Sequence, residues 1–355
     1  MRVLALTRYG RLGSSSRVRF YQYFPYLQSR GLEIVNASFF DDGYVNSLYS
    51  GQRLSVRPIV LAYLKRLLDL IKSISFDFIW VEKEMLPWFP ALFEFLLRKS
   101  NIPYVVDYDD AVFHRYDMHP SSIVRTLLRH KVDRVMRNAA LVIAGNEYLA
   151  ERAKQAGADK VELLPSVVDV YRYRQKQPDG NSTFTIGWIG SPVTSPYLDI
   201  IRDAITGFGS ELSIRISLLG AGSINPFPNI LTTILPWDEE IELSIGEHFD
   251  VGIMPLTDGP FERGKCGYKL VQYMAGGLPV IASPVGVNQQ IVEHNINGYL
   301  ATSTDDWLLA LRTLKHDINK RYEMGQAGRR KAEKLYNLQV TAPKLLTLLL
   351  NVRKG

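Results

Sequence analysis

Short apolar segments alternate with helical segments along most of this chain, and this alternation limits the possible fold more than any other feature. In the first half, the segments apolar enough for buried strands are 1–6, 32–37, 76–81, 102–107 and 140–144. Helical patterns separate them, ending near Gly31 and covering 57–73, 90–99, 121–137 and 147–156. Because Pro25 lies inside the first of these helical stretches, we expect a kink or a late restart there. Strands separated by helices are typical of a parallel α/β sheet.

The alternation pauses at a polar and turn-rich segment, YRYRQKQPDGNS, and then resumes. Strand-like segments follow at 184–189, 214–219, 250–254 and 280–283, with helices near 196–206, 268–275 and 305–314 and over most of 320–352. The 355 residues suffice for two domains. We therefore predict two Rossmann-like domains facing a central cleft. The boundaries are an N-terminal domain at 1–170, a linker at 171–183, a C-terminal domain at 184–335 and a C-terminal helix at 336–355 that returns to the N-terminal domain.

Composition removes several classes of protein. Hydrophobic residues make up 46% of the chain and charged residues 22%, which is typical of a folded globular protein and excludes general disorder. The single cysteine, Cys266, excludes a disulfide framework and a cysteine-based zinc site. No apolar run approaches the roughly 18 residues of a spanning helix, and the apolar start VLAL is too short for a signal peptide. We therefore expect a cytoplasmic protein.

The positive charge is concentrated in the first half. Residues 1–165 contain 23 Lys and Arg against 17 Asp and Glu, so they account for the whole net charge of +6. The remaining residues are neutral overall. Such asymmetry predicts an anionic partner for the first half, either a membrane surface or a nucleic acid.

The segment 264–284, GKCGYKLVQYMAGGLPVIASP, carries the clearest chemical signal. It follows an apolar strand and places a glycine-rich turn directly before a helix. The start of a helix attracts phosphate through its N–H groups and its dipole. Lys265 and Lys269 lie four residues apart, so both can reach a diphosphate, and Gln272 lies one turn later, where it can bind a ribose or sugar hydroxyl. Solvated helix lysines are the alternative interpretation of the same pattern.

KLVQYMAGGLPVI within this segment resembles the helix motif of the retaining GT-B glycosyltransferases of family 4, the group 1 glycosyl transferases. LVIAGNEYLAERA, LLPSVVDVYRY, GWIGSP and SPVGVNQQIVEHNINGYLA are similar to further segments of that family. The resemblance implies a GT-B fold in which the C-terminal domain binds a nucleotide diphosphate sugar and the N-terminal domain binds the acceptor. It implies a metal-independent, hexosyltransferase-type reaction without a cofactor, in which cationic side chains, here Lys269 and Lys265, stabilise the leaving diphosphate.

Departures from the family pattern concern the donor site. The two glutamates of the family fall on Gly264 and Gln272, and the arginine that many relatives carry after the first strand of the C-terminal domain falls on Ser191. Glu262 is a weak substitute for a glutamate, and Lys265 or Arg263 can supply the second cation. The donor-binding residues that the resemblance implies are Gly190, Ser191, Arg263, Gly264, Gly267, Gln272, Val287 and Asn288.

Candidate acceptor residues follow the strands of the first half. Asp109 and Asp110 lie at the end of a strand, where Asp109 can orient an acceptor or act as an acid or base, since paired carboxylates raise each other's pKa. Helix or loop capping is the competing interpretation. Glu84 ends another strand beside Glu82. The loop GRLGSSSR supplies Gly13, Ser14 and Arg17, and Arg8 and Arg19 lie nearby for an anionic acceptor.

The helix expected at 121–137 is basic and amphipathic. Val124, Leu128, Val132 and Val135 share one face, and the other positions include Arg125, Arg129, His130, Lys131, Arg134 and Arg137. Such a helix packs its apolar face on a sheet, and its arginines can contact an anionic membrane. We therefore expect peripheral association with the inner face of the cell membrane as an addition to the cytoplasmic location. The helix matches no nucleic-acid reader motif, so we expect no nucleic-acid partner.

These observations favour a glycosyltransferase of cell-surface glycan or polysaccharide assembly, with a nucleotide sugar as donor and a glycan or lipid-linked molecule as acceptor. Two alternatives remain open. A nucleotide-sugar epimerase of GT-B architecture would use cleft carboxylates such as Asp109 and Asp110. A catalytically inactive subunit of the same fold would account for the missing glutamates.

Overall fold

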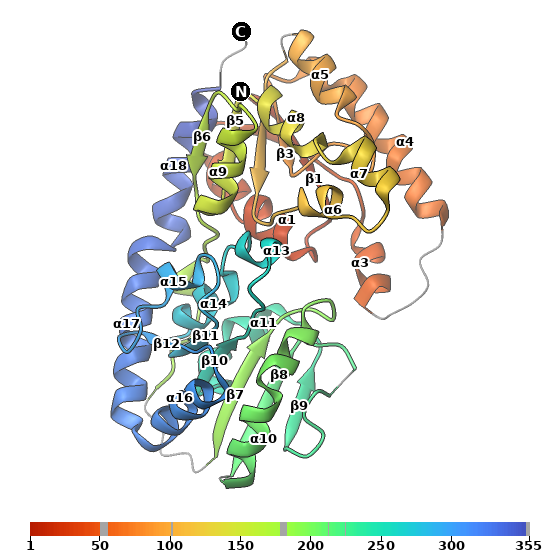
Figure 1. The fold of residues 1–355 in the computed structure, drawn as a ribbon. Coiled ribbons are helices and arrows are strands. Elements are labelled where there is room, and N and C mark those ends of the chain that lie inside the picture. Colours follow the sequence, from red (N-terminus) through yellow and green to blue (C-terminus); the bar gives the residue numbers. More distant parts are fainter. Residues whose placement is uncertain (50–55, 101, 178–182, 212, 224, 353–355) are drawn as a thin grey trace. The chain divides into compact units, whose positions relative to one another are not determined.

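Two parallel sheets of six strands each form the framework of the computed structural model (Figure 1). The structure describes residues 1–49, 56–100, 102–177, 183–211, 213–223 and 225–352. Contacts divide the chain into two compact units, the first comprising Met1–Ser166, Arg263–Cys266 and Thr341–Gly355 and the second Val167–Glu262 and Gly267–Val340. The predicted α/β class and the two Rossmann-like folds are confirmed. Part of the predicted linker, 178–182, lies outside the described residues.

The sheet of the first unit has the strand order β2-β1-β3-β4-β5-β6. Its strands β1, β3, β4 and β5 are almost wholly buried because their sequences are continuous apolar runs, as expected for parallel strands covered on both faces. The strands are β1 (Arg2–Thr7), β2 (Glu33–Ser38), β3 (Phe78–Glu82), β4 (Tyr104–Tyr108), β5 (Leu141–Ala144) and β6 (Val161–Leu163). The sequence analysis missed β6, a three-residue edge strand.

The helices of the first unit differ from the prediction at two places. The stretch before Gly31 is a π-helical turn (Arg17–Tyr21) followed by α2, which has Pro25 in its first turn, so the late restart is confirmed. The single basic helix at 121–137 is wrong, because it divides into α7 and α8 at Arg129 and His130. The helices are α1 (Ser14–Ser16), α2 (Phe24–Ser29), α3 (Asp42–Tyr49), α4 (Val56–Lys72), α5 (Leu92–Lys99), α6 (His114–Asp117), α7 (Ser122–Leu128), α8 (Lys131–Asn138) and α9 (Glu147–Gln155), with a short 3-10 turn at Ser73–Ser75.

The sheet of the second unit has the order β12-β11-β10-β7-β8-β9. Large side chains such as Trp188 and Trp307 are buried around it. The strands are β7 (Phe184–Ile189), β8 (Ile214–Leu219), β9 (Thr232–Leu235), β10 (Val251–Met254), β11 (Val280–Ala282) and β12 (Gly298–Leu300). The two edge strands β9 and β12 were not predicted, because each is short and only partly buried.

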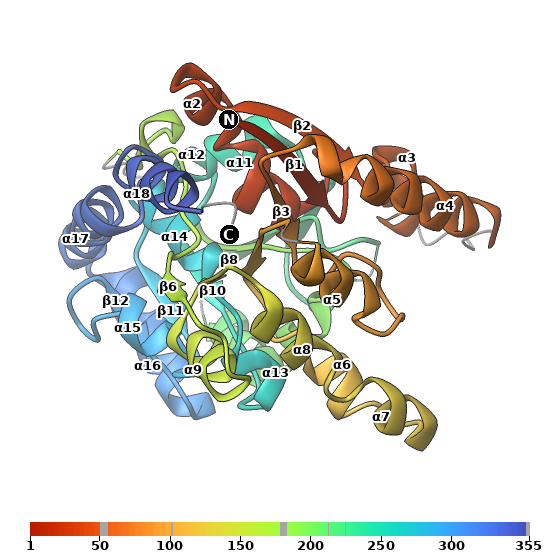
Figure 2. The ribbon, with the colours of Figure 1, turned by 90° about the horizontal axis from the view of Figure 1, so that it is seen from above.

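Helices separate most strands of this second sheet along the sequence, and the last ones, drawn in blue, follow its final strand (Figure 2). They are α10 (Arg202–Glu211), α11 (Glu239–Leu243), α12 (Ile245–His248), α13 (Pro260–Arg263), α14 (Tyr268–Ala275), α15 (Asn288–Ile291), α16 (Thr304–His316), α17 (Ile318–Leu335) and α18 (Leu338–Leu350), with 3-10 turns at Val170–Arg172 and Ser195–Ile201. From Thr341 onward, α18 belongs to the first unit. This confirms that the C-terminal helix returns to the N-terminal domain.

Glu94 on α5 provides a pH-dependent test of the first core. Burial raises the pKa of its carboxyl above the ordinary value of 4.5, and the carboxyl accepts a hydrogen bond from the Met85 N–H at 3.3 Å. The pKa of Glu94 is thus higher in the folded state than in the unfolded state, where it is about 4.5. The protonated carboxyl therefore contributes its full stability below pH 4.5, and this contribution is lost as the pH rises through the folded pKa. Glu94→Gln should therefore stabilise the chain, and by more at pH 8 than at pH 4.

Urea unfolding at those two pH values measures this effect. Glu151→Gln, on the exposed side of α9, is the control and should show little difference at either pH. A Glu94→Gln variant that is less stable than the wild type at pH 8 would contradict the prediction.

Candidate functional site

The second sheet reverses its strand order between β7 and β10, and this is where ligands of doubly wound sheets bind, at the carboxyl ends of the strands. β7 and β10 pair directly in parallel at this point. Gly190 and Ser191 form the turn after β7, and the glycine-rich segment before α14 follows β10. The topology therefore brings two of the predicted donor segments to one edge of one sheet.

Lys269, in the first turn of α14, points its ammonium group at the turn after β7. Its Nζ lies 4.1 Å from the centre of the Trp188 ring and donates a hydrogen bond to Thr194 Oγ1 at 3.4 Å. A Cβ atom at Gly190 would lie 2.8 Å from this Nζ and 2.2 Å from the Trp188 ring, so only glycine fits there. The backbone of the turn thus closely approaches a fixed cation at the start of α14, an arrangement that favours an anionic group there.

The predicted donor residues Gly267, Val287 and Asn288 meet at the start of α14. Gly267 has a φ of +63°, and a Cβ there would lie 2.3 Å from Ile291 Cδ1 and 3.2 Å from Val287 Cγ1. Asn288 is buried and donates a hydrogen bond from Nδ2 to the Ser283 carbonyl oxygen at 3.1 Å. This packing fixes the glycine turn against α15, and Asn288 supports the turn from inside.

Gln272 occupies a different environment from the one expected. Its side chain is 2% exposed and hydrogen-bonds the hydroxyl of Tyr173. The geometry therefore gives Gln272 a partner inside the protein, and its contact with a ribose hydroxyl stays a prediction. Glu262, the weak substitute for a family glutamate, accepts a hydrogen bond from the hydroxyl of Tyr197.

The segment Arg263–Cys266 belongs to the first unit. Asn146, the N-cap of α9, holds it by donating from Nδ2 to the carbonyl oxygens of Gly264 at 2.9 Å and Lys265 at 3.0 Å. A Cβ at Gly264 would lie 2.4 Å from Ala111 Cβ and 2.9 Å from the Ala111 nitrogen. The glutamate that the family carries at this position cannot be accommodated against that backbone, which gives a physical reason for the glycine.

The first sheet reverses its order between β1 and β3, and a group of charged side chains lies at that carboxyl edge. Lys83, directly after β3, has a φ of +65° and places its Nζ 2.8 Å from Asp109 Oδ1 and 3.7 Å from Asp110 Oδ2. The same Nζ donates to Ser15 Oγ at 3.1 Å. The structure thus brings the predicted Asp109 and Asp110 together with a lysine and a serine that the sequence analysis did not select.

The pKa values of the two carboxyls shift in opposite directions. Burial raises the pKa of the Asp109 carboxyl, but the attraction of the Lys83 ammonium and the hydrogen bonds from Lys83 and Ser15 together outweigh it, so the pKa lies below its usual value. The pKa of Asp110 is raised, first by burial and then by the charge of Asp109, and the charges of Lys83 and Lys265 offset part of this rise. Asp110 is also the more exposed of the two, with 26% of its side chain accessible against 13% for Asp109.

The loop after β1 contacts the carboxyl edge of the first sheet through the hydroxyl groups of Ser15 and Ser16. Ser16 Oγ donates to Glu82 Oε2 at 2.6 Å, and the backbone N–H of Arg8 donates to the same oxygen at 2.7 Å. The residues selected from the sequence lie around these contacts. Gly13 caps α1, Ser14 is exposed beside it, and Arg17 begins the π-helical turn.

Three charged residues that were expected in the acceptor site or on the basic helix face are buried, namely Glu84, Arg19 and Lys131. Glu84 accepts hydrogen bonds from Lys131 Nζ at 2.5 Å and from the Tyr116 hydroxyl at 2.8 Å, so Lys131 is not part of an exposed basic face. Arg19 is also buried, and its guanidinium binds both carboxylate oxygens of Asp107. These pairs leave Arg19 without a place in an acceptor site, and the acceptor role of Glu84 stays a prediction.

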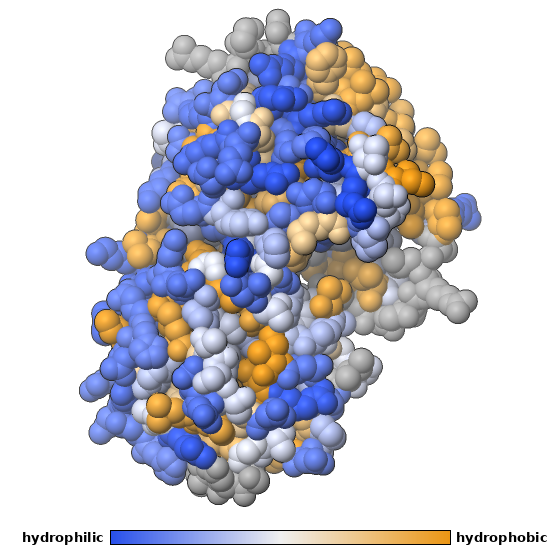
Figure 3. All heavy atoms as spheres, in the orientation of Figure 1, coloured by the Kyte–Doolittle hydropathy of each residue, from blue (hydrophilic) through white to orange (hydrophobic). Residues whose placement is uncertain are grey.

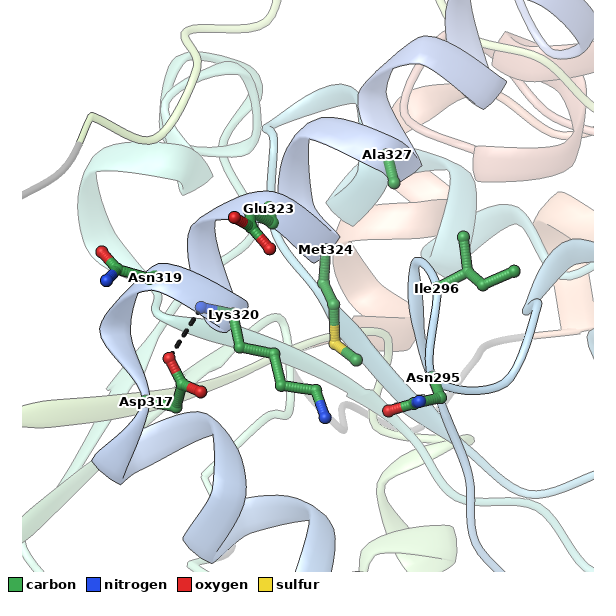
Figure 4. A pocket seen from close by; sticks show the side chains of 8 residues that line it. All are labelled: Asn295, Ile296, Asp317, Asn319, Lys320, Glu323, Met324 and Ala327. Carbon is green, nitrogen blue, oxygen red and sulfur yellow. Dashed lines mark hydrogen bonds between the residues drawn. The ribbon is translucent and has the colours of Figure 1, made fainter.

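A hollow of about 620 Å³ lies elsewhere in the second unit, beside α17 (Figure 4). Asp317 and Lys320 lie at its rim, and the Asp317 carboxylate caps α17 by accepting from the Lys320 N–H at 2.9 Å. None of the predicted donor residues lines this hollow.

Sequence reasoning missed four side chains that complete the two edges. Thr194 and Trp188 contact Lys269, and Lys83 and Ser15 contact the aspartate pair. Lys83 stands between two glutamates that were both noted, so its place after a buried strand was a usable signal. Nothing in the local sequence indicates that Trp188 would lie beneath the lysine of a helix eighty residues later.

Comparison with known families matches both halves of the chain. Residues 25–166 match the family described as "Glycosyl transferase 4-like domain" and residues 243–317 match "Glycosyl transferases group 1". Together the two matches span more than half of the chain.

Individual relatives agree with these matches. Sulfoquinovosyl transferase SQD2 of Arabidopsis thaliana is 24% identical over 363 residues, which cover 90% of this chain and 68% of the relative. The crystal structure of Anabaena HepE in complex with UDP has a TM-score of 0.73 at 19% identity, covering 98% of this chain and 99% of that one. WaaG, a glycosyltransferase involved in lipopolysaccharide biosynthesis, has a TM-score of 0.71 at 12% identity, covering 99% and 100%. The chain is a glycosyltransferase of the group 1/family 4-like kind and has the GT-B fold.

Proposed function

We propose that this glycosyltransferase moves a sugar from a nucleotide diphosphate sugar to a glycan or lipid-linked acceptor, with retention of the anomeric configuration, in the assembly of a cell-surface polysaccharide or glycan. The observation that carries the donor assignment is Lys269, whose ammonium lies against the Gly190 turn at the switch point of the second sheet. The HepE structure contains UDP and WaaG acts in lipopolysaccharide biosynthesis, and both support the proposed classes of donor and product.

The donor diphosphate is proposed to bind between the start of α14 and the turn after β7. Lys269 supplies the fixed charge, and Gly190 and Gly267 let the backbone approach the phosphates. Lys265 is the proposed second cation, and Ser191 and Thr194 can donate hydroxyl hydrogen bonds to phosphate oxygens. Such fixed charges favour the transition state, in which negative charge grows on the departing diphosphate.

The acceptor is proposed to bind at the carboxyl edge of the first sheet. Asp109, ionised and held by Lys83, orients an acceptor hydroxyl by accepting its hydrogen bond. The transfer breaks the bond between the anomeric carbon and the diphosphate oxygen and forms a bond to the acceptor oxygen. The proton of the acceptor hydroxyl passes to the leaving diphosphate. The proposed reaction needs no metal, which activity in the presence of a chelator tests.

A thermal-shift screen of nucleoside diphosphates and nucleotide sugars identifies the donor. The selected nucleotide sugar is then incubated with the protein alone and with candidate glycan and lipid-linked acceptors. Transfer only in the presence of an acceptor supports the proposal. Isomerisation of the sugar without an acceptor would show an epimerase, and donor binding without any turnover would show a non-catalytic subunit.

Replacing Asp109 by asparagine should reduce kcat/KM for the acceptor about tenfold, because a hydrogen bond to a carboxylate is stronger than one to an amide by roughly 1 kcal/mol or more. Donor affinity should not change. Steady-state kinetics with varied acceptor, together with calorimetry of donor binding, measure the two effects. Asp159→Asn, on the exposed surface of the same unit, is the control. Unchanged acceptor kinetics in Asp109→Asn would remove Asp109 from the site.

A further inference from the structure

Helix α4 carries its apolar side chains on the outside. The side of α4 that is buried carries Ala62, Arg66 and Leu70. Arg66 is only 1% exposed, and its guanidinium donates to the Thr7 carbonyl oxygen at 2.8 Å and to the Ala37 carbonyl oxygen at 3.1 Å. Leu64 and Leu68, one turn apart, are 54% and 58% exposed. A helix that buries an arginine and exposes its leucines is the reverse of the ordinary surface helix, and a large exposed apolar patch marks an interaction site.

The exposed apolar surface continues beyond α4 along one side of the first unit. The Tyr63 hydroxyl donates to the Pro87 carbonyl oxygen at 2.5 Å, and the Tyr63 ring lies 5.2 Å from that of Phe89. Trp88 in turn lies 5.2 Å from the ring of Tyr116 and 5.7 Å from that of His119, just before α7. Figure 3 shows orange, apolar side chains gathered over α4 and α5. We define the apolar face by its exposed members Leu64, Leu68, Ile71, Trp88 and Phe89.

Basic side chains border this face. Among the described residues of 56–74, 86–100 and 120–130, seven Lys and Arg are not buried, whereas Asp69 is the one acidic residue that is not buried. Lys65 and Lys72 lie next to the leucine stripe on α4, and Lys99 lies over Phe95 on α5 with its Nζ 4.9 Å from the ring centre. An apolar stripe with a cationic border is the pattern of a helix that lies in the headgroup region of an anionic bilayer.

The charge of the border decides between a bilayer and a second copy of the chain. In a symmetric dimer the same patch would meet itself, so the basic borders would face each other and repel. A bilayer with anionic headgroups pairs with them instead. Among the described residues, no helix is long and apolar enough to cross a membrane.

We propose that the apolar face, centred on α4, docks the first unit on an anionic lipid bilayer, with the leucines of α4 and Trp88 in the acyl–headgroup boundary. This surface lies beside the carboxyl edge of the first sheet. The backbone N–H of Trp88 donates to the Tyr116 hydroxyl at 3.1 Å, and that hydroxyl donates to Glu84, two residues after β3. One part of the proposal rests on the proposed function, namely that docking gives a lipid-linked acceptor a path to this edge. Docking itself requires neither donor nor acceptor.

Flotation of the full chain tests docking, with vesicles of phosphatidylcholine alone and of phosphatidylcholine mixed with phosphatidylglycerol. The wild type should float with the mixed vesicles and only weakly with the neutral ones. Leu64→Gln/Leu68→Gln should bind the mixed vesicles about a hundredfold more weakly, since burying each leucine is worth about a factor of ten or more. Lys65→Gln/Lys72→Gln should lose mainly the preference for anionic lipid.

The matched control is Leu309→Gln/Leu335→Gln, which removes two leucines of the second unit that are 67% and 47% exposed. It should float like the wild type. Circular dichroism and nucleotide affinity establish that each variant is folded. Quenching of tryptophan fluorescence by brominated lipid should occur in the wild type and largely disappear in Trp88→Phe.

Failure of the wild type to float with either vesicle, or equal flotation of the wild type and Leu64→Gln/Leu68→Gln, would overturn the proposal. A dimer in light scattering that the leucine variant dissociates, without lipid binding, would assign the face to a second copy instead. Sugar transfer to a soluble acceptor by a chain that does not float would reject docking and retain the proposed function. Flotation of a chain that transfers no sugar to any acceptor would support docking and reject the proposed function.

Discussion

Alanine at Lys269 should weaken the binding of the preferred nucleoside diphosphate about ten- to a hundredfold, and sugar transfer should fall at least as far. The Lys269 ammonium lies 4.1 Å from the centre of the Trp188 ring, and the backbone of Gly190 approaches it so closely that a Cβ there would lie 2.8 Å from the Nζ. A hydrogen bond to a charged group is worth roughly 1.5–3 kcal/mol, which corresponds to that change in affinity. Because the charge on the diphosphate grows during transfer, the loss in kcat adds to the loss in affinity.

Calorimetry with the wild type and Lys269→Ala measures this prediction. Lys320→Ala is the matched control, since its Nζ also lies over an aromatic ring of the second unit, 5.7 Å from the centre of Tyr299, but beside the hollow of α17. The control should bind the nucleotide like the wild type. Equal affinity of Lys269→Ala and the wild type for every nucleoside diphosphate would reject the diphosphate assignment.

The sequence alone predicted the architecture because the strong signals are local. The central strands are continuous apolar runs, and the helix that begins at Tyr268 follows a glycine turn that the pattern places directly. The strands β6, β9 and β12 were missed because three or four partly buried residues at a sheet edge have no periodicity of their own. Their pairing depends on a neighbouring strand that is distant in sequence.

The site was less predictable because its decisive contacts are tertiary. The break between α7 and α8, together with the pairing of Lys131 with Glu84, converts a presumed surface lysine into a buried one. The position of Gln272 in the sequence likewise predicts a contact with the nucleotide sugar, but its side chain is buried and hydrogen-bonds the Tyr173 hydroxyl. At Gly264 the sequence showed a departure from the family but not its cause. The close approach of Ala111 in the structure explains why a glycine replaces the glutamate of the family.

The buried pair of Arg19 and Asp107 should dominate the stability of the first unit. Arg19 Nε lies 2.7 Å and Nη2 3.2 Å from the two carboxylate oxygens of Asp107, and Nη1 donates to the Leu164 carbonyl oxygen at 2.8 Å. Removing one partner of a buried pair leaves the other charge without compensation. Arg19→Met should therefore lower the free energy of unfolding by about 3–5 kcal/mol.

This loss should depend on pH. Burial raises the pKa of the Asp107 carboxyl to about 6 even though Arg19 attracts it. A folded pKa above the unfolded one means that the carboxyl's stability contribution is full at low pH and is lost as the pH rises through the folded value. Without Arg19 the folded pKa rises further, so the deficit of Arg19→Met should be larger at pH 8 than at pH 5.

Hydrogen exchange of the β4 and β5 amides, measured at pH 5 and pH 8 and corrected for the intrinsic exchange rate at each pH, reports this effect for the first unit alone. Arg2→Met breaks an exposed pair with Glu33, in which the side chains are 48% and 60% accessible, and it should cost less than about 1 kcal/mol. Asp107→Asn in the Arg19→Met background removes the unpaired charge and should restore much of the loss at pH 8. If Arg19→Met destabilises the unit no more than Arg2→Met does, the pair does not hold the first sheet together, and the carboxyl edge proposed to bind the acceptor is stabilised by other contacts.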